Sequence, residues 1–266
     1  KRKQIGEMIM FRDEFNSVCN AAKGKMALLN NNPAGYFMSA MVAGAFITLG
    51  GFVTFTLGSI LTAAGCTITK VIMAFSFASA LSLVVMAGAE LFTGNNFVMA
   101  AASFKKEVSW LDTLKLWVVC YLGNFVGAVI LVALFQLGGV PKGATGEYFA
   151  TIAAGKMGGT ASALFFKGML CNMLVCLAVW CCTKMKTESG KLIMIFWCIY
   201  IFMACGFEHS IANMSVMAVG LLNGAGVEGV SIAGYFHNLL WVTLGNIAGG
   251  ALLVAFPYYI IQKEKK

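Results

Sequence analysis

Long apolar stretches alternate with short polar segments along the whole chain. A helix needs about 20 apolar residues to cross a bilayer, and six stretches are long enough: 35–61, 71–103, 112–137, 160–183, 190–221 and 234–261. The pattern predicts an all-α membrane protein with six transmembrane helices. We expect the transmembrane domain to cover residues 33–262 and a short tail to cover 263–266.

Residues 1–32 have a different pattern, in which single apolar residues recur every three or four positions. These residues are Phe11, Phe15, Val18, Ala22, Met26 and Leu29, and polar side chains stand between them. The spacing predicts an amphipathic helix on the membrane surface. A lid over the pore mouth is the alternative.

The net charge of +8 is distributed unevenly between the two sides of the membrane. If the N-terminus is cytoplasmic, all the basic residues fall in cytoplasmic segments except Lys70, Lys142, Lys156 and Lys167. This positive-inside bias predicts that both termini lie in the cytoplasm and that the chain spans the cytoplasmic membrane. It explains the basic excess without nucleic acid as a partner, and no cleavable signal precedes the spans.

Two segments of the chain repeat. GAELFTGNNFVMA at 88–100 matches GFEHSIANMSVMA at 206–218, and LGNFVGAVILV at 122–132 matches LGNIAGGALLV at 244–254. Spans two and three therefore correspond to spans five and six, in halves of about 33–137 and 160–262. Because each half has three spans, the halves must insert with opposite topology, as in the inverted repeats of many transport proteins.

The first repeated segment also interrupts spans two and five with polar and glycine residues. Irregular backbone at membrane depth is tolerated only when protein buries it or when it lines a wet cavity. We therefore expect two broken helices, with half-helices that begin near Asn95 and Ile211. Their N-termini would direct positive dipole ends at the pore centre, which favours an anion or a polar neutral solute.

Several polar residues lie at these breaks. His209 is a titratable group inside an apolar span, which usually marks a pathway or relay. Glu90 and Glu208 occupy equivalent positions, and we expect each to accept backbone N–H bonds that hold the broken segment in shape. Asn95 and Asn213 are also equivalent and are expected to cap the half-helices.

Other polar residues are less informative. Lys156, in the small-residue stretch AAGKMGG, and Lys167 could each attract anions, although Lys167 could instead snorkel to the interface. Seven of the nine cysteines fall inside spans, where they act as small apolar residues: Cys120, Cys171, Cys176, Cys181, Cys182, Cys198 and Cys205. No catalytic or metal-binding motif is present, so we expect neither an enzyme nor a cofactor.

Four motifs in order resemble the formate/nitrite transporter family: GAELFTGN at 88–95, KGMLCNMLVCLAVW at 167–180, GFEHSIANM at 206–214 and NLLWVTLGNIAGG at 238–250. The resemblance covers essentially the whole chain. It implies an aquaporin-like fold with helices two and five broken, a homopentamer with one pore per protomer, and passage of formate, nitrite or hydrosulfide. The tails and loops look most like the hydrosulfide channel branch.

The resemblance also assigns roles to residues. The family's central histidine matches His209, its loop threonine matches Thr93, and its pore-region lysine matches Lys156. The chain departs from the family at Trp241, where a proline is common, which leaves the shape of span six open. The apolar constrictions implied are Phe77, Leu81, Leu91, Phe92, Val175 and Phe202.

The sequence thus predicts a channel for small anions with a central histidine between apolar constrictions. A proton-coupled transporter of the same anions and an aquaporin-like channel for neutral solutes are alternatives, although the NPA signature is absent. A non-transporting scaffold is a third. All the candidate anions are small and monovalent, so the residues do not rank them.

Overall fold

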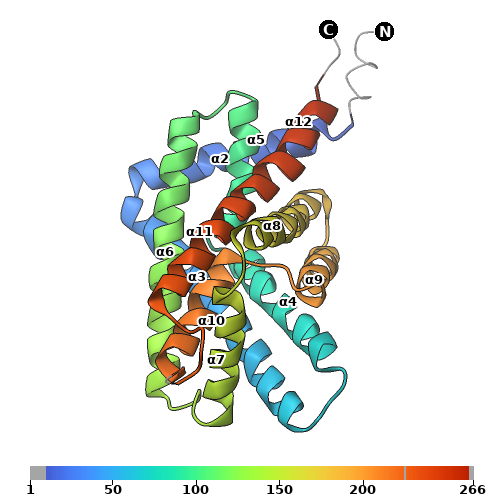
Figure 1. The fold of residues 1–266 in the computed structure, drawn as a ribbon. Helices are drawn as coiled ribbons and strands as arrows, with labels where there is room; N and C mark the ends of the chain where they lie inside the picture. Colours follow the sequence, from blue (N-terminus) through green and yellow to red (C-terminus); the bar gives the residue numbers. More distant parts are fainter. Residues whose placement is uncertain (1–9, 225, 264–266) are drawn as a thin grey trace, which may run out of the picture.

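The computed structural model describes residues 10–224 and 226–263, and every regular element in them is a helix (Figure 1). The first nine residues of the predicted surface helix and the last three of the tail lie outside this range. In chain order the elements are α2 (Arg12–Asn31), α3 (Pro33–Ala63), α4 (Thr69–Ala87), α5 (Phe92–Phe104), α6 (Trp110–Leu137), α7 (Ala144–Met157), α8 (Ala161–Lys184), α9 (Glu188–Ala204), α10 (Ser210–Asn223), α11 (Ile232–Ala248), the π-helical stretch η2 (Gly249–Ala255) and α12 (Phe256–Ile261).

Five of the predicted spans contain a helix long and apolar enough to cross a membrane: α3, α4, α6, α8 and the continuous run Ile232–Ile261. Span five consists of two shorter helices, α9 with 17 residues and α10 with 14. Span two is likewise divided into α4 and α5. Both breaks lie where the repeated segment predicted them. The half-helices begin at Phe92 and Ser210, slightly earlier than expected.

Each break begins at a glycine in the left-handed region. Gly88 has φ +79° and Gly206 has φ +70°, and these two residues occupy matching positions of the repeat. A side chain is strained in this region, whereas glycine adopts it freely. The repeated glycine therefore ends the first half of each broken helix and lets the chain turn towards the centre.

Helix α7 is an element that the sequence pattern did not predict. It precedes α8, carries Lys156 in its last turn, and packs against α10. The two helices approach so closely that a Cβ on Gly220 would lie 2.3 Å from the Ala153 Cβ. The small-residue stretch before span four is therefore part of a helix that places Lys156 beside the second break.

The last span continues without interruption through Trp241, which lies inside α11. Its irregular part begins at Gly249, where α11 becomes π-helical. A Cβ on Gly249 would lie 2.2 Å from the Met169 carbonyl oxygen, so the chain crosses α8 there at very short range. The departure from the family at Trp241 thus leaves the helix intact.

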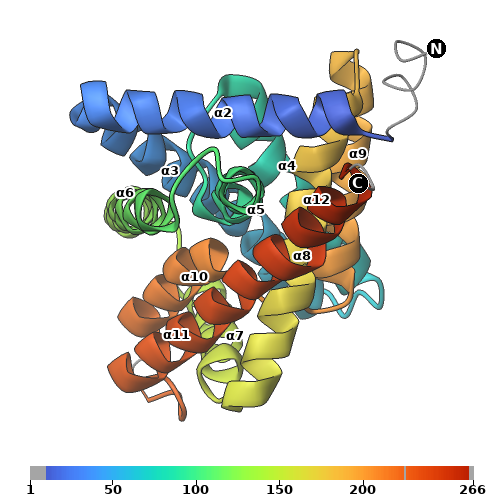
Figure 2. The ribbon, with the colours of Figure 1, turned by 90° about the horizontal axis from the view of Figure 1, so that it is seen from above.

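Helix α2 lies across one end of the bundle, the same end as α12 (Figures 1 and 2). It packs on α3 and α5. The predicted apolar stripe is its buried face, with Phe15, Val18, Cys19, Ala22, Met26 and Leu29 in the core. Most of the polar residues between them are exposed, whereas Asn16 and Lys25 are half-buried.

Candidate functional site

The two breaks meet at Thr93 and His209. Thr93 lies in the first turn of α5 and His209 caps the start of α10, so the two half-helix N-termini face each other. The Thr93 Oγ1 and His209 Nε2 atoms are 3.0 Å apart, and both side chains are buried. The structure therefore brings together two of the three residues predicted for the pore centre.

The hydrogen bonds of His209 assign its tautomer. The Ala212 N–H donates to His209 Nδ1 at 3.1 Å, so Nδ1 carries no proton. A neutral imidazole then has its proton on Nε2, which donates to Thr93 Oγ1. In the imidazolium form, the N–H group at Nδ1 would face the Ala212 N–H, and no hydrogen bond could form between them. His209 is thus fixed as a neutral ring with a hydrogen-bond donor at the centre.

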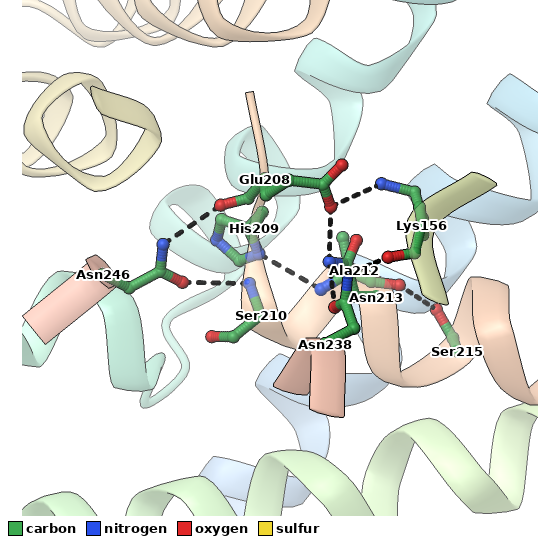
Figure 3. A network of polar contacts seen from close by, with 9 residues as sticks. All are labelled: Lys156, Glu208, His209, Ser210, Ala212, Asn213, Ser215, Asn238 and Asn246. Atoms are coloured by element: carbon green, nitrogen blue, oxygen red, sulfur yellow. Dashed lines mark hydrogen bonds and ion pairs between the residues drawn. The ribbon is translucent and has the colours of Figure 1, made fainter. Parts of the chain in front are cut away.

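Figure 3 shows the polar network around Glu208, which precedes His209 in the second break. The Glu208 carboxylate accepts from Asn213 Nδ2 at 2.6 Å and from Lys156 Nζ at 2.8 Å. Asn213 also donates to Asn238, which in turn donates to the Lys156 carbonyl oxygen. This network therefore links Lys156 of α7 to the break directly and to α10 and α11 through Asn213 and Asn238.

The first break has the same construction around Glu90. Its carboxylate accepts from Asn95 Nδ2 at 2.9 Å and from Lys25 Nζ at 2.5 Å. Lys25 belongs to α2, so the surface helix contributes a cation to this break as α7 does to the other. Sequence analysis did not predict this role for Lys25, because the pair joins residues 65 positions apart.

Two predicted roles are wrong in detail. Glu90 and Glu208 accept from asparagine and lysine side chains, and not from the backbone of the broken segment. Asn95 and Asn213 lie one turn inside the half-helices and bond these glutamates. They therefore do not cap the helices.

Besides His209 at the start of α10, side chains of the second repeated motif satisfy the first N–H groups of the half-helices. Asn124 on α6 accepts from the Phe92 N–H, and Asn246 on α11 accepts from the Ser210 N–H, both at 2.9 Å. The same two side chains donate to the carbonyl oxygens of Glu90 and Glu208. The asparagine shared by the two LGN motifs was thus the signal that could have predicted these caps.

Asn172 on α8 is a further polar residue that was missed. Its Nδ2 lies within hydrogen-bond distance of the carbonyl oxygens of Thr93, at 3.2 Å, and Asn246, at 2.6 Å. It is fully buried. Asn172 therefore ties α5, α8 and α11 together directly behind the Thr93–His209 contact.

A cavity lies on each side of this contact. The α7 cavity, of about 350 Å³, is lined by Lys156, Glu208, His209 and residues of α3, α4 and α9. The α2 cavity, of about 400 Å³, is lined by Lys25, Glu90 and residues of α2, α4 and α8. Of the predicted constriction residues, Phe77 and Phe202 line the α7 cavity, and Leu81 and Leu91 line the α2 cavity.

The remaining candidates lie elsewhere. The Phe92 ring packs against Tyr121 of α6, and buried Val175 lines neither cavity. The Lys167 side chain is exposed, while its carbonyl oxygen accepts from the Glu208 N–H. Cys205 departs from the expected burial of the span cysteines, because it is exposed in the second break and lines the α7 cavity. The described residues contain no cluster of three His, Cys, Asp or Glu side chains that could hold a metal.

Comparisons with known proteins agree with this architecture. Residues 12–260 match the family model described as formate/nitrite transporter. The nitrite transporter NirC of Escherichia coli is 40% identical, over 94% of this chain and 92% of its own length. The formate channel FocA of Haemophilus influenzae is 34% identical, over 88% and 89%.

Solved structures give the same result. An FNT family ion channel superposes with a TM-score of 0.87 at 35% identity, covering 93% of this chain and 98% of that one. A pentameric formate channel with formate bound superposes with a TM-score of 0.74 at 28% identity, covering 86% and 96%. The fold, the two breaks and these relatives lead to one conclusion: the chain belongs to the formate/nitrite transporter family.

Proposed function

We propose that the chain is a channel that conducts small monovalent anions, with nitrite, formate and hydrosulfide as its candidate substrates. The observation that carries this proposal is the Thr93–His209 contact between two cavities that each hold a lysine. The names of the relatives favour nitrite and formate. Hydrosulfide remains a prediction from the general likeness of the tails and loops.

The proposed path runs from the α7 cavity, past Phe77 and Phe202, to Thr93 and His209, and then past Leu81 and Leu91 into the α2 cavity. The Phe77 and Phe202 rings pack edge to face with centroids 5.8 Å apart, which favours loss of water from the entering ion. The ion then meets the positive ends of α5 and α10, which partly replace its hydration. The ion pairs Lys25–Glu90 and Lys156–Glu208 each hold a lysine ammonium beside one break, where the anion meets it on its path.

His209 acts in this proposal as a neutral hydrogen-bond donor through Nε2. Protonation of the permeating anion by His209, the relay predicted from sequence, requires the ring to charge and to lose its bond from the Ala212 N–H. The observed bonds favour the donor role. Flux should therefore show no step attributable to His209 titration between about pH 5 and 8, the range in which an ordinary histidine titrates.

The positive-inside bias supports an orientation with α2 and the α2 cavity on the cytoplasmic side. The pentameric state of the formate channel relative supports a homopentamer with one path in each protomer. Native mass spectrometry of the protein in detergent should give five chains per particle, and a stable monomer that conducts would contradict this part of the proposal.

The function is tested by flux from proteoliposomes loaded with nitrite, formate, hydrosulfide or chloride, each at two pH values. We expect flux of at least the first two. Replacing the acceptor by Thr93→Val leaves the His209 donor without its partner and should change flux about fivefold or more. Thr183→Val, at the rim of the α2 cavity, is the matched control.

Two results would overturn parts of the proposal. Swelling in glycerol without any anion flux would favour a channel for neutral solutes. If the anion accumulates against its own concentration gradient when a proton gradient is imposed, proton-coupled transport would be favoured. His209→Phe separates the two histidine roles through the flux that remains. Residual flux that no longer depends on pH supports the relay, and reduced flux with an unchanged pH dependence supports the donor.

A further inference from the structure

The α7 and α2 cavities have similar volumes but different walls. The apolar wall of the α7 cavity contains four aromatic rings and two methionines beside aliphatic side chains such as Ile152 and Val216. The rings and methionines are Phe55, Phe77, Phe202, Phe207, Met73 and Met203. No described aromatic residue lines the α2 cavity, whose apolar wall is made by Val, Leu and Ala side chains. Both cavities would serve equally well as water-filled entrances for ions of a few atoms, so the aromatic wall needs another explanation.

The α7 cavity is also large for the anions that the channel is proposed to conduct. Its volume of about 350 Å³ is roughly ten times the share of a single water molecule in the liquid. Ligand pockets of about 300 Å³ and above hold organic molecules of drug size, and they are typically apolar with a few polar groups. The α7 cavity meets this description, with Lys156 and Asn213 among its polar groups.

The charges of the two cavities differ as well. Lys70 and Lys156 line the α7 cavity with one carboxylate, Glu208, while Lys25 and Glu90 balance in the α2 cavity. Lys156 is committed to Glu208, but Lys70 is exposed at the start of α4 and forms no ion pair with any described carboxylate. With His209 neutral, the lining groups of the α7 cavity carry a surplus of one positive charge.

We propose that the α7 cavity binds small aromatic monoanions, of the benzoate or benzenesulfonate type, and that such a ligand blocks the channel from this side. The flat ring lies among the phenylalanine rings and the thioethers of Met73 and Met203, which both favour contact with aromatic groups. The anionic group faces Lys70 and Lys156. The ring does not pass the Phe77–Phe202 pair, so the ligand stays in the cavity.

The blocking effect rests on the proposed function, whereas binding does not. Binding is therefore measured separately, by saturation-transfer NMR and calorimetry on the purified protein with benzenesulfonate as the probe. Methanesulfonate lacks the ring and benzyl alcohol lacks the charge. We expect both to bind at least tenfold more weakly than benzenesulfonate, because each loses one of the two recognition elements.

Variants locate the ligand. Phe55→Leu removes one ring from the wall and should weaken binding about threefold, and Lys70→Gln should weaken it about threefold and reduce its salt dependence. The matched control is Phe75→Leu: Phe75 is on the same helix as Phe77, but its ring is exposed outside the cavity and packs on Phe196. Equal weakening by Phe55→Leu and Phe75→Leu would show that the ligand binds elsewhere.

Sidedness provides the second test. Benzenesulfonate is permanently charged and does not cross the bilayer, so it can be added to one face of cells or of inverted vesicles. We expect inhibition of nitrite or formate flux from the α7 face, and about tenfold weaker inhibition from the α2 face. No binding with normal flux overturns this inference and leaves the proposed function standing. Binding with no flux of any anion overturns the proposed function and leaves the site.

Discussion

Helices α2 and α7 each bring a lysine to the glutamate of one break, but they are held in different ways. Phe149, Ala150 and Ala153 of α7 are fully buried, and α10 lies against them without room for a side chain at Gly220. Helix α2 lies across the end of the bundle, and exposed ion pairs such as Lys23–Glu107 contribute to its attachment. Exposed pairs stabilise by only about 0–1 kcal/mol. The lysine–glutamate pair is therefore anchored in the core by α7 at one break and attached to a peripheral helix, α2, at the other.

This difference has a consequence for function. Helix α2 also has a buried face, but 11 of its 20 residues are exposed, compared with four of the 14 residues of α7. Local unfolding costs least in exposed segments, so α2 should separate from the bundle more readily than α7. Lys156 is then a permanent part of its entrance, while Lys25 leaves whenever α2 does. The predictions below test this contrast, beginning with the helix contacts themselves.

The largest effect is expected from adding a single methyl group at two glycines, Gly220 in the contact of α10 with α7 and Gly24 on the exposed face of α2. Gly220→Ala places a Cβ 2.3 Å from the Ala153 Cβ, and overpacking of this kind destabilises by about 1–3 kcal/mol. Gly24→Ala on α2 meets nothing within 4 Å and should stabilise the helix by about 0.5–1 kcal/mol. Thermal unfolding of the two variants in detergent checks the pair. Equal shifts would show that α7 is not fixed by this contact.

The second prediction compares the two lysines. Lys156→Gln leaves Glu208 buried without its cation and should lower anion flux about tenfold at low salt. Lys25→Gln leaves the more exposed Glu90, whose charge water can screen, and should lower flux about threefold. Flux is measured at two ionic strengths, since screening should reduce the Lys25 effect more.

The double variants Lys25→Gln with Glu90→Gln and Lys156→Gln with Glu208→Gln serve as controls. Each removes a whole pair and separates the loss of a cation from the exposure of an unpaired carboxylate. If each double variant had the same flux as its single lysine variant, the unpaired carboxylates would play no part.

The sequence predicted the parts of this molecule that local pattern determines. Apolar length predicted the spans, and the repeated segments at 88–100 and 206–218 predicted both breaks, because polar and glycine residues interrupt apolar helices there. Helix α7 was missed because glycines such as Gly146 and Gly155 are typical of loops. Gly146 is needed in the helix because Asn223 and Pro141 lie too close for a side chain, whereas Gly155 has open space around it.

The polar contacts of the site were harder to predict, because they join distant parts of the chain. Periodicity identified the apolar face of α2, but no local pattern indicates that Lys25 reaches Glu90. Asn124 and Asn246 were visible as a repeated motif, yet their role depends on which backbone groups the breaks leave free. The repeat could have predicted more. Once Lys156 is known to pair with Glu208, the repeat indicates that a lysine should also pair with the equivalent Glu90.

A smaller effect is expected at the start of α2. The Phe11 ring packs edge to face on Trp180 and Tyr258, and the Lys184 ammonium lies 3.9 Å from its centroid. Phe11→Leu keeps an apolar side chain but removes the ring, and should cost about 1 kcal/mol of local stability. Hydrogen exchange should then rise about fivefold in α2 and stay constant in α7. Unchanged exchange in α2 would show that this aromatic cluster does not hold the helix.

The smallest effect is a dependence of α2 on pH. Hydrogen bonds from Lys105 and Lys23 lower the pKa of Glu107 from its ordinary value of 4.5. Because the folded pKa is depressed, this stabilisation is complete above the ordinary value and is lost as the pH falls below 4.5 through the folded pKa. The protection of α2 against hydrogen exchange, corrected for the intrinsic rate at each pH, should therefore decrease slightly between about pH 5 and 3. Glu107→Gln should remove this step, and α7, whose lysine pairs with a buried glutamate, should not show it. A step of equal size in α7, or a step that persists in Glu107→Gln, would mean that both helices respond to pH through a shared group. The two helices would then not differ in their stability at low pH.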